Sequence, residues 1–226
     1  MSDRRVTFGI GLGEALAAGV RGYLANLWPL SVAGAATLGT YVAFRLPAQA
    51  AADSGFVARS LVLDLAGLIV AAVVAHPWFS YALDADRGMG IDLLKPFNRP
   101  AGFMVQAVAS IWFWAAMVFG LRYLYGIPSI LALLFYAFYG FVVADRRATS
   151  GLKALGTSAR IGEGRRVGLF GIAAVLTVLN LFGAVAVGFG VNPGTLALTV
   201  LGLVVTTNVS LVTGARIYRT LENETE

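Results

Sequence analysis

The sequence predicts an all-α, polytopic membrane bundle, and composition, segment length and the placement of cations all indicate it. Of the 226 residues, 58% are hydrophobic and 13% are charged, against roughly 45–50% and 25% in soluble globular domains. The mean hydropathy is +0.77. A soluble domain of this size could not hide so much apolar surface from water, and a disordered chain would be poor in apolar residues. We expect one integral membrane domain over residues 1–226.

Six stretches are long and apolar enough to cross a bilayer as helices, which takes about 20 residues each. The alternating ten-residue pattern of a membrane β-barrel is missing from the sequence, and backbone groups in lipid must be satisfied within the segment. The predicted spans cover residues 28–46, 57–80, 101–123, 127–144, 167–190 and 194–215.

The basic residues support this number of spans. Of the 17 Lys and Arg residues, three (Arg45, Arg59 and Arg122) fall on one side of the predicted membrane, which leaves 14 on the other. Cations collect on the cytoplasmic side, so the sequence predicts both termini in the cytoplasm. The same placement accounts for the net charge of +5 and the pI near 9.8 without nucleic acid, because anionic lipid headgroups are suitable partners.

Two further segments predict amphipathic helices in the cytoplasmic interface, over residues 8–26 and 148–162. In the first, large apolar residues recur every fourth position, as an apolar helical stripe requires: Phe8, Leu12, Leu16, Val20 and Leu24. In the second, Leu152, Leu155 and Ala159 form a narrower stripe. Within the spans, Ala35 with Gly39 and Ala184 with Gly188 have the small-residue spacing that allows helices to approach closely.

Asp64 is the most informative single residue for function. It lies about seven residues, or about 10 Å, into the second predicted span, where an ionisable group costs about 2.5–3.5 kcal/mol and faces protein or water. We predict that Asp64 pairs with Arg122 or Arg45. Either the pair is structural and fixes helix order, or it belongs to a gated polar or proton-coupled site.

Asn180 and Asn208 form a second candidate polar site. Both lie near the middle of the membrane on adjacent antiparallel spans, so we expect hydrogen bonds across the two helices, worth about 0.6–2 kcal/mol each. Such bonds hold helices together, but the same polar groups could also line a hydrophilic path or a pocket for a lipid headgroup.

The remaining chemical signals point away from catalysis. His76 is the only histidine and the chain has no cysteine, so a metal cluster is not expected. His76 precedes Pro77 and is interpreted as an interfacial residue beside a proline kink. Asp84 and Asp86 are predicted to lie in a solvated loop. No phosphate-binding, dinucleotide-binding or metalloprotease motif occurs in the sequence. We expect no cofactor, no metal and no enzymatic activity.

From residue 100 onward, over about 130 residues, the chain resembles a bacterial family. The resemblance rests on short motifs: Leu124-Tyr-Gly-Ile-Pro128, Gly151-Leu-Lys-Ala-Leu155 with Ser158, Gly164-Arg-Arg166, Leu169-Phe-Gly171, Leu179-Asn-Leu-Phe-Gly183 and Ala215-Arg-Ile-Tyr-Arg219 with Leu221. The chain is similar to the membrane domain fused to some glycerophosphoryl diester phosphodiesterases and to its stand-alone six-helix relatives. In the fused proteins a separate soluble domain does the chemistry. The resemblance therefore implies a protein of the bacterial inner membrane without an activity of its own.

The basic segment 146–166 is the predicted docking surface for anionic lipid or for a membrane or cytoplasmic protein partner. Its cations are Arg146, Arg147, Lys153, Arg160, Arg165 and Arg166. The function expected from these observations is a non-enzymatic scaffold or accessory component for a partner or lipid process at the cytoplasmic membrane. The alternative is a small transporter or lipid-handling subunit with a polar path between spans two, five and six.

Overall fold

The computed structural model describes residues 11–190 and 193–224, and these residues form helices without a β-strand. Its elements are α1 (Leu12–Ala25), α2 (Leu27–Asp53), α3 (Val57–Val74), α4 (His76–Asp86), α5 (Pro100–Tyr123), α6 (Ile127–Tyr136), α7 (Tyr139–Ala144), α8 (Gly151–Ile161), α9 (Arg166–Gly183), the short 3₁₀ helix η1 (Val185–Phe189) and α10 (Pro193–Asn223).

The six predicted spans are confirmed as helical stretches of sufficient length and apolarity to cross a membrane. Within the described residues they are Leu27–Asp53, Val57–Val74, Pro100–Tyr123, Ile127–Ala144, Arg166–Gly183 and Ala197–Asn223. The first is longer than predicted, because the helix continues past Pro47 to Asp53. The fifth is shorter than predicted, because α9 ends at Gly183 and residues 185–189 form η1.

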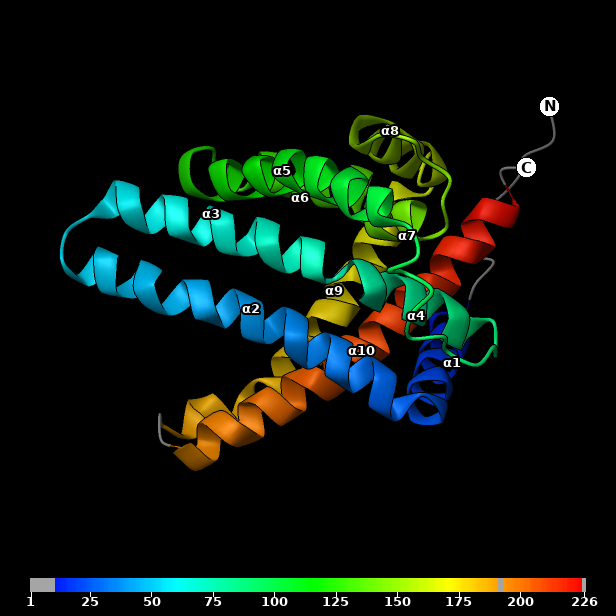
Figure 1. The fold of residues 1–226 in the computed structure, drawn as a ribbon, viewed down its shortest axis with the longest axis horizontal. Coiled ribbons are helices and arrows are strands. Elements are labelled where there is room, and N and C mark those ends of the chain that lie inside the picture. The colour runs from blue at the N-terminus through cyan, green and yellow to red at the C-terminus, as the bar shows by residue number, and fades with distance from the viewer. Residues whose placement is uncertain (1–10, 191–192, 225–226) are drawn as a thin grey trace.

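The long helices pack as three hairpins that form a ring (Figure 1). Neighbours pack in the order α10, α2, α3, α5, α6, α9 and back to α10, and the contact between α6 and α9 is the weakest of these. In Figure 1 the α9–α10 hairpin diverges from the α2–α3 hairpin. The ring is therefore least closed at the seam between α6 and α9.

The second predicted span is wrong at its inner end, because residues 76–80 belong to a separate helix. Pro77 has no backbone N–H and its ring would clash with a carbonyl four residues earlier, so α3 ends at Val74 and α4 starts at His76. Nine of the eleven residues of α4 are buried. A short helix that is buried on all sides lies inside the protein, and α4 packs against α10, α7, α1 and α2.

The fourth span is broken between α6 and α7, and a side chain from α8 satisfies the exposed backbone. The Ser158 hydroxyl donates to the carbonyl oxygen of Phe135 (3.1 Å) and accepts from the backbone N–H of Phe138 (3.1 Å). Ser158 is buried. Because unpaired backbone groups in lipid are costly, α8 positions the hydroxyl that lets the fourth span bend.

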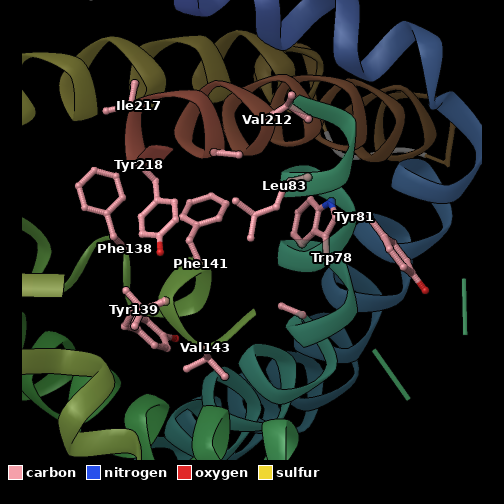
Figure 2. Close-up of a cluster of buried hydrophobic side chains, with 14 of the residues drawn as sticks. Trp78, Tyr81, Leu83, Phe138, Tyr139, Phe141, Val143, Val212, Ile217 and Tyr218 are labelled. Carbon is pink, nitrogen blue, oxygen red and sulfur yellow. The ribbon is translucent and has the colours of Figure 1, made fainter. Parts of the chain in front are cut away.

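The main core lies where α4, α7 and α10 meet. Figure 2 shows aromatic rings of residues 138–141 beside Tyr218 of α10 and Leu83 of α4. The ring of Phe141 stacks on Tyr218 with centroids 5.7 Å apart. This packing joins helices far apart in sequence and fixes the end of the bundle at which α4 lies.

Helices form inside both segments predicted to be interfacial, as α1 and α8; residues 8–10 of the first lie outside the described residues. The side of α1 that packs on α10 consists of Ala15, Gly19 and Tyr23. Of its predicted apolar stripe, Val20 and Leu24 are exposed, Leu24 by 61%, whereas Leu12 and Leu16 are partly buried. The second half of the stripe therefore faces away from the protein.

Candidate functional site

The structure places Asp64 of α3 against Arg45 of α2. The Nη1 atom of Arg45 lies 2.8 and 2.7 Å from the two carboxylate oxygens of Asp64. The predicted pairing with Arg45 is therefore confirmed. Arg122 of α5 lines the same small cavity as Asp64 but forms no ion pair with any residue that the structure describes. The pair joins α2 to α3 near the tip of their hairpin.

We expect Arg45→Gln to lower the stability of the purified protein by about 1–2 kcal/mol. The expected loss is smaller than the cost of an unpaired charge at the centre of a span, because the Arg45–Asp64 pair lies near the end of α3. The double variant Arg45→Gln/Asp64→Asn should recover most of the loss, since it removes the unpaired carboxylate. Apparent Tm values in detergent for the unmodified protein, Arg45→Gln, Asp64→Asn and the double variant measure this coupling. Purely additive losses would show that the pair contributes nothing.

The predicted hydrogen bonding between Asn180 and Asn208 is wrong. The Oδ1 atom of Asn208 accepts from Trp78 Nε1 of α4 at 2.7 Å, and its Nδ2 donates to the carbonyl of Val204 at 2.7 Å. The Oδ1 atom of Asn180 accepts instead from the Ser210 hydroxyl at 3.5 Å. The reason is that α4 places Trp78 beside α10, where its indole N–H binds the side-chain oxygen of Asn208.

A double-mutant cycle on Trp78 and Asn208 should show coupling of about 1–2 kcal/mol. The bond is buried, so each single change leaves one polar group unpaired. The expected coupling is above the average of about 0.6 kcal/mol for hydrogen bonds between membrane helices. The changes Trp78→Phe and Asn208→Leu, alone and together, would be compared by apparent Tm. Coupling below 0.5 kcal/mol would contradict the assigned role of Asn208.

Asn180 lines a cavity of about 380 Å³ at the seam between α6 and α9. Its walls come from α4, α6, α7, α9 and α10 and are mostly apolar, with Phe79, Phe138, Leu169 and Leu211 among them. Four polar groups also line it: Thr177, Asn180, Thr207 and Ser210. The Thr177 and Thr207 hydroxyls donate to carbonyls of their own helices, so the cavity is apolar with a small polar strip.

This cavity exists because α9 is the least buried of the six candidate spans, with 6% of its residues buried inside the protein. The cavity near Asp64 is a different one. It is lined by α2, α3 and α5 and shares no residue with the cavity near Asn180. The structure therefore does not bring the two predicted polar sites together.

The six cations of the predicted docking surface have two different roles. Arg147 pairs with Glu222 and with Asp145, Arg165 pairs with Glu224, and Arg166 stacks on the ring of Phe135 with a separation of 3.8 Å. Arg146, Lys153 and Arg160 form no ion pair within residues 11–190 and 193–224. Half of the predicted docking cations thus hold the protein together.

The prediction that Asp84 and Asp86 lie in a solvated loop is wrong. Both residues belong to α4, and their side chains are almost completely buried. Asp84 accepts from Lys95 at 2.7 and 2.8 Å, and Asp86 accepts from Arg219 of α10 at 2.7 Å. Arg87 extends the network to Asp145 at 2.7 Å. We call this cluster of ion pairs, centred on Asp84, Asp86 and Asp145, the charged end. This cluster was not predicted, because the pairs that join it across the fold, Arg87 with Asp145 and Arg219 with Asp86, lie 58 and 133 residues apart in the chain.

A tyrosine holds the loop that follows α4. The Tyr81 hydroxyl donates to the carbonyl oxygen of Leu93 at 2.8 Å. Burial, with a smaller effect of the Asp92 charge, raises the pKa of Tyr81 above its ordinary value of 10.0. The hydroxyl therefore keeps its proton at neutral pH and the loop over residues 87–99 stays attached to the charged end.

No family model matches the chain, and neither a curated protein sequence nor a solved structure matches it significantly. The resemblance to the membrane domain of glycerophosphoryl diester phosphodiesterases stays a prediction based on short motifs. The class that fold and composition define is a multi-pass helical membrane protein.

Proposed function

We propose that the protein is a non-enzymatic, lipid-handling component of the cytoplasmic membrane that binds the apolar chain of a lipid at the seam between α6 and α9. The observation that supports this function is the cavity of about 380 Å³ beside the least buried span. Ligand cavities of roughly 300–1,000 Å³ with mostly apolar walls and a few polar groups are typical binding sites.

The position of the cavity favours a lipid as the occupant. Apart from Trp78 and Phe79 of α4, its walls lie in the segments long enough to cross the membrane, so hydrocarbon chains would surround the seam. The polar strip of Asn180, Ser210, Thr177 and Thr207 comes from α9 and α10. An apolar chain that carries a polar linkage, as an ester-linked acyl chain does, would match both kinds of wall.

Charge and exposure support the orientation in this proposal. The charged end contains the cations Arg87, Lys95, Arg147, Arg216 and Arg219, and cations collect on the cytoplasmic side. The exposed Val20 and Leu24 of α1 suit a helix in the membrane interface. Arg146, Lys153 and Arg160 would then face anionic headgroups or an acidic partner.

The alternative of a transporter would need a conformational change that joins two cavities. Asp64 and Asn180 line separate spaces, and α3 packs mainly against α2, α5 and α4. A polar path between spans two, five and six thus has fewer observations in its favour than lipid binding at the seam.

Photolabelling tests the proposed function. The purified protein in nanodiscs would be irradiated with a phospholipid that carries a diazirine at mid-chain, and labelled peptides from residues 127–144 and 166–183 would be quantified. Ala173→Trp should reduce this labelling by about fivefold, because Ala173 lines the cavity and an indole would occupy much of its volume.

Ala174→Trp is the matched control, since Ala174 is the next residue on α9, is exposed and does not line the cavity. Labelling within twofold of the unmodified protein is expected for it. Equal loss in both variants, or no loss in Ala173→Trp, would mean that the lipid contacts only the outer surface of α9 and would overturn the proposal.

A further inference from the structure

A third cavity, of about 520 Å³, lies at the charged end, and its lining differs from that of the cavity at the seam. Its walls are α4, the loop before α5, the first turn of α5 and residues 143–149. None of its lining residues lines the cavity at the seam between α6 and α9. What could bind here is therefore a separate question from the apolar chain proposed above.

The walls carry positive charge without a matching carboxylate. Lys95, Arg99 and Arg146 line the cavity, and its lining residues include no Asp or Glu. Lys95 is compensated, because its Nζ atom lies 2.7 and 2.8 Å from the carboxylate of Asp84. Arg99 and Arg146 have no ion pair in the part of the chain that the structure describes. Two unmatched guanidinium groups beside one cavity favour an anion.

A buried imidazole on the cavity wall lacks a partner. His76 is 5% exposed, and its Nδ1 atom has no hydrogen-bond partner among the described residues. Buried polar side-chain atoms nearly always have one. The ring lies over the first turn of α5, since a Cβ atom on Gly102 would come within 2.7 Å of its Nε2 atom. The imidazole lines the cavity, and the Nε2 end of its ring is the one beside the cavity wall at Gly102, so a ligand with a hydrogen-bond acceptor could reach it there.

The start of α5 adds a hydrogen-bond donor to the same wall. Arg99 occupies the N-cap position without making a side-chain cap bond, and Ala101 and Gly102 of the first turn line the cavity. Pro100 has no N–H, and the N–H of Gly102 donates to the carbonyl of Arg99 at 3.0 Å, so of these lining residues the N–H of Ala101 is the one left without an acceptor among the described residues. Together with the helix dipole this group attracts an anion, and the turn lies beside His76.

The backbone at Arg146 also fits a functional position. Arg146 has φ of +65° just after α7, in a conformation that usually belongs to glycine or asparagine. Its N–H donates to the carbonyl of Val143 at 3.1 Å, so the residue closes the helix as a glycine would. An arginine at this strained position contributes a cation to the cavity that glycine could not supply.

We propose that this cavity binds the phosphate group of a phosphate ester. Arg99 and Arg146 supply the charge, and His76 with the first turn of α5 supplies hydrogen bonds. A phospholipid headgroup and a small soluble phosphate ester share this chemistry. The proposal does not depend on the cavity at the seam. Its test compares the affinities of probes that differ in their headgroups, whereas the test of the seam cavity labels the protein from an acyl chain.

The test measures affinity of the full-length protein in detergent, by thermophoresis, for three probes. Glycerol 3-phosphate represents the soluble source, dioctanoyl phosphatidic acid the lipid source, and dioctanoyl phosphatidylcholine a lipid without net charge. Arg146→Gly should weaken binding of the preferred phosphate probe by about tenfold, in line with the loss of a charge-assisted contact. Its apparent Tm without ligand should stay the same or rise, because glycine suits the backbone there.

Arg59→Gln is the control for general surface charge. Arg59 is exposed on α3, has no ion pair among the described residues and does not line the cavity. Binding within twofold of the unmodified protein is expected. Gly102→Ala provides a variant without charge change: its methyl group would displace His76, and we expect affinity to fall by about threefold or more.

Tighter binding of phosphatidic acid than of glycerol 3-phosphate would support the proposal and assign the site to a lipid headgroup, and the reverse order would assign it to a soluble ester. The proposal is overturned if both phosphate probes bind no tighter than phosphatidylcholine. It is equally overturned if Arg59→Gln weakens binding as much as Arg146→Gly, because the attraction would then be spread over the surface.

Discussion

Asp86→Asn is expected to lower the apparent Tm of the purified protein by roughly 6–12 °C. The Asp86 carboxylate is 1% exposed and lies 2.7 Å from Arg219 and 3.9 Å from Arg216. Removing one partner of a buried ion pair costs about 3–5 kcal/mol. Because Arg219 remains 29% exposed and water can partly solvate it, we expect about 3 kcal/mol, converted at 2–4 °C per kcal/mol.

Asp53→Asn provides the comparison for this loss. Asp53 ends α2 with an exposed carboxylate that, among the described residues, accepts only from the Gln49 side chain at 2.8 Å, so its change should shift the apparent Tm by about 1 °C. Arg219→Gln combined with Asp86→Asn should be more stable than the sum of the two single losses. If Asp86→Asn melts with the unmodified protein, the charged end does not fasten α4 to α10.

Gly202→Val should destabilise the protein by about 3 kcal/mol by separating α9 from α10. A Cβ atom on Gly202 would collide with the carbonyl oxygen of Gly183, and one on Gly183 would lie 2.7 Å from the carbonyl oxygen of Gly202. The obstacle is backbone on both sides, so no side-chain rotation can relieve it. The α9–α10 contact is the main attachment of α9, and the apparent Tm would report its loss.

Gly171→Val is the matched control on α9. A Cβ atom on Gly171 has nothing within 4 Å, so this valine should change stability by less than about 0.5 kcal/mol. The same comparison corrects the small-residue motifs chosen from the sequence. Gly39 and Gly188 have open space around them, whereas the close helix approach is at Gly183 and Gly202. A loss in Gly171→Val equal to that in Gly202→Val would exclude close packing as the cause.

The spans could be predicted because their cause is local. A helix of about 20 apolar residues is recognisable from its own composition, and all six were found, with errors at their ends and with the break between α6 and α7 in the fourth unforeseen. The end at Val74 was missed although Pro77 signals a helix start, because the apolar run continues through Trp78 and Phe79. The pairing of Asp64 with Arg45 was predictable as well, since a carboxylate in a span needs a cation at its own depth and few were available.

The polar contacts inside the bundle were harder to predict, because they depend on an element that the sequence did not reveal. The residues of α4 were predicted to form the end of a span and a loop. In the structure they form a helix whose Trp78 donates a hydrogen bond to Asn208 and whose Asp86 pairs with Arg219. For the same reason Asn180 and Asn208, which were predicted to bond to each other, have different partners, Ser210 and Trp78. His76 became a candidate ligand group only when its ring was found beside Gly102.

The sequence by itself determined that the chain is helical, that six segments can cross a membrane and that cations gather toward one end, since hydropathy and charge are properties of each segment. The tertiary structure alone decided which charges are neutralised, where the three cavities lie and which glycines allow contact. These features arise between residues as distant as Asp86 and Arg219, which are 133 positions apart. Their free energies depend on distance and burial, which no segment carries in its own composition.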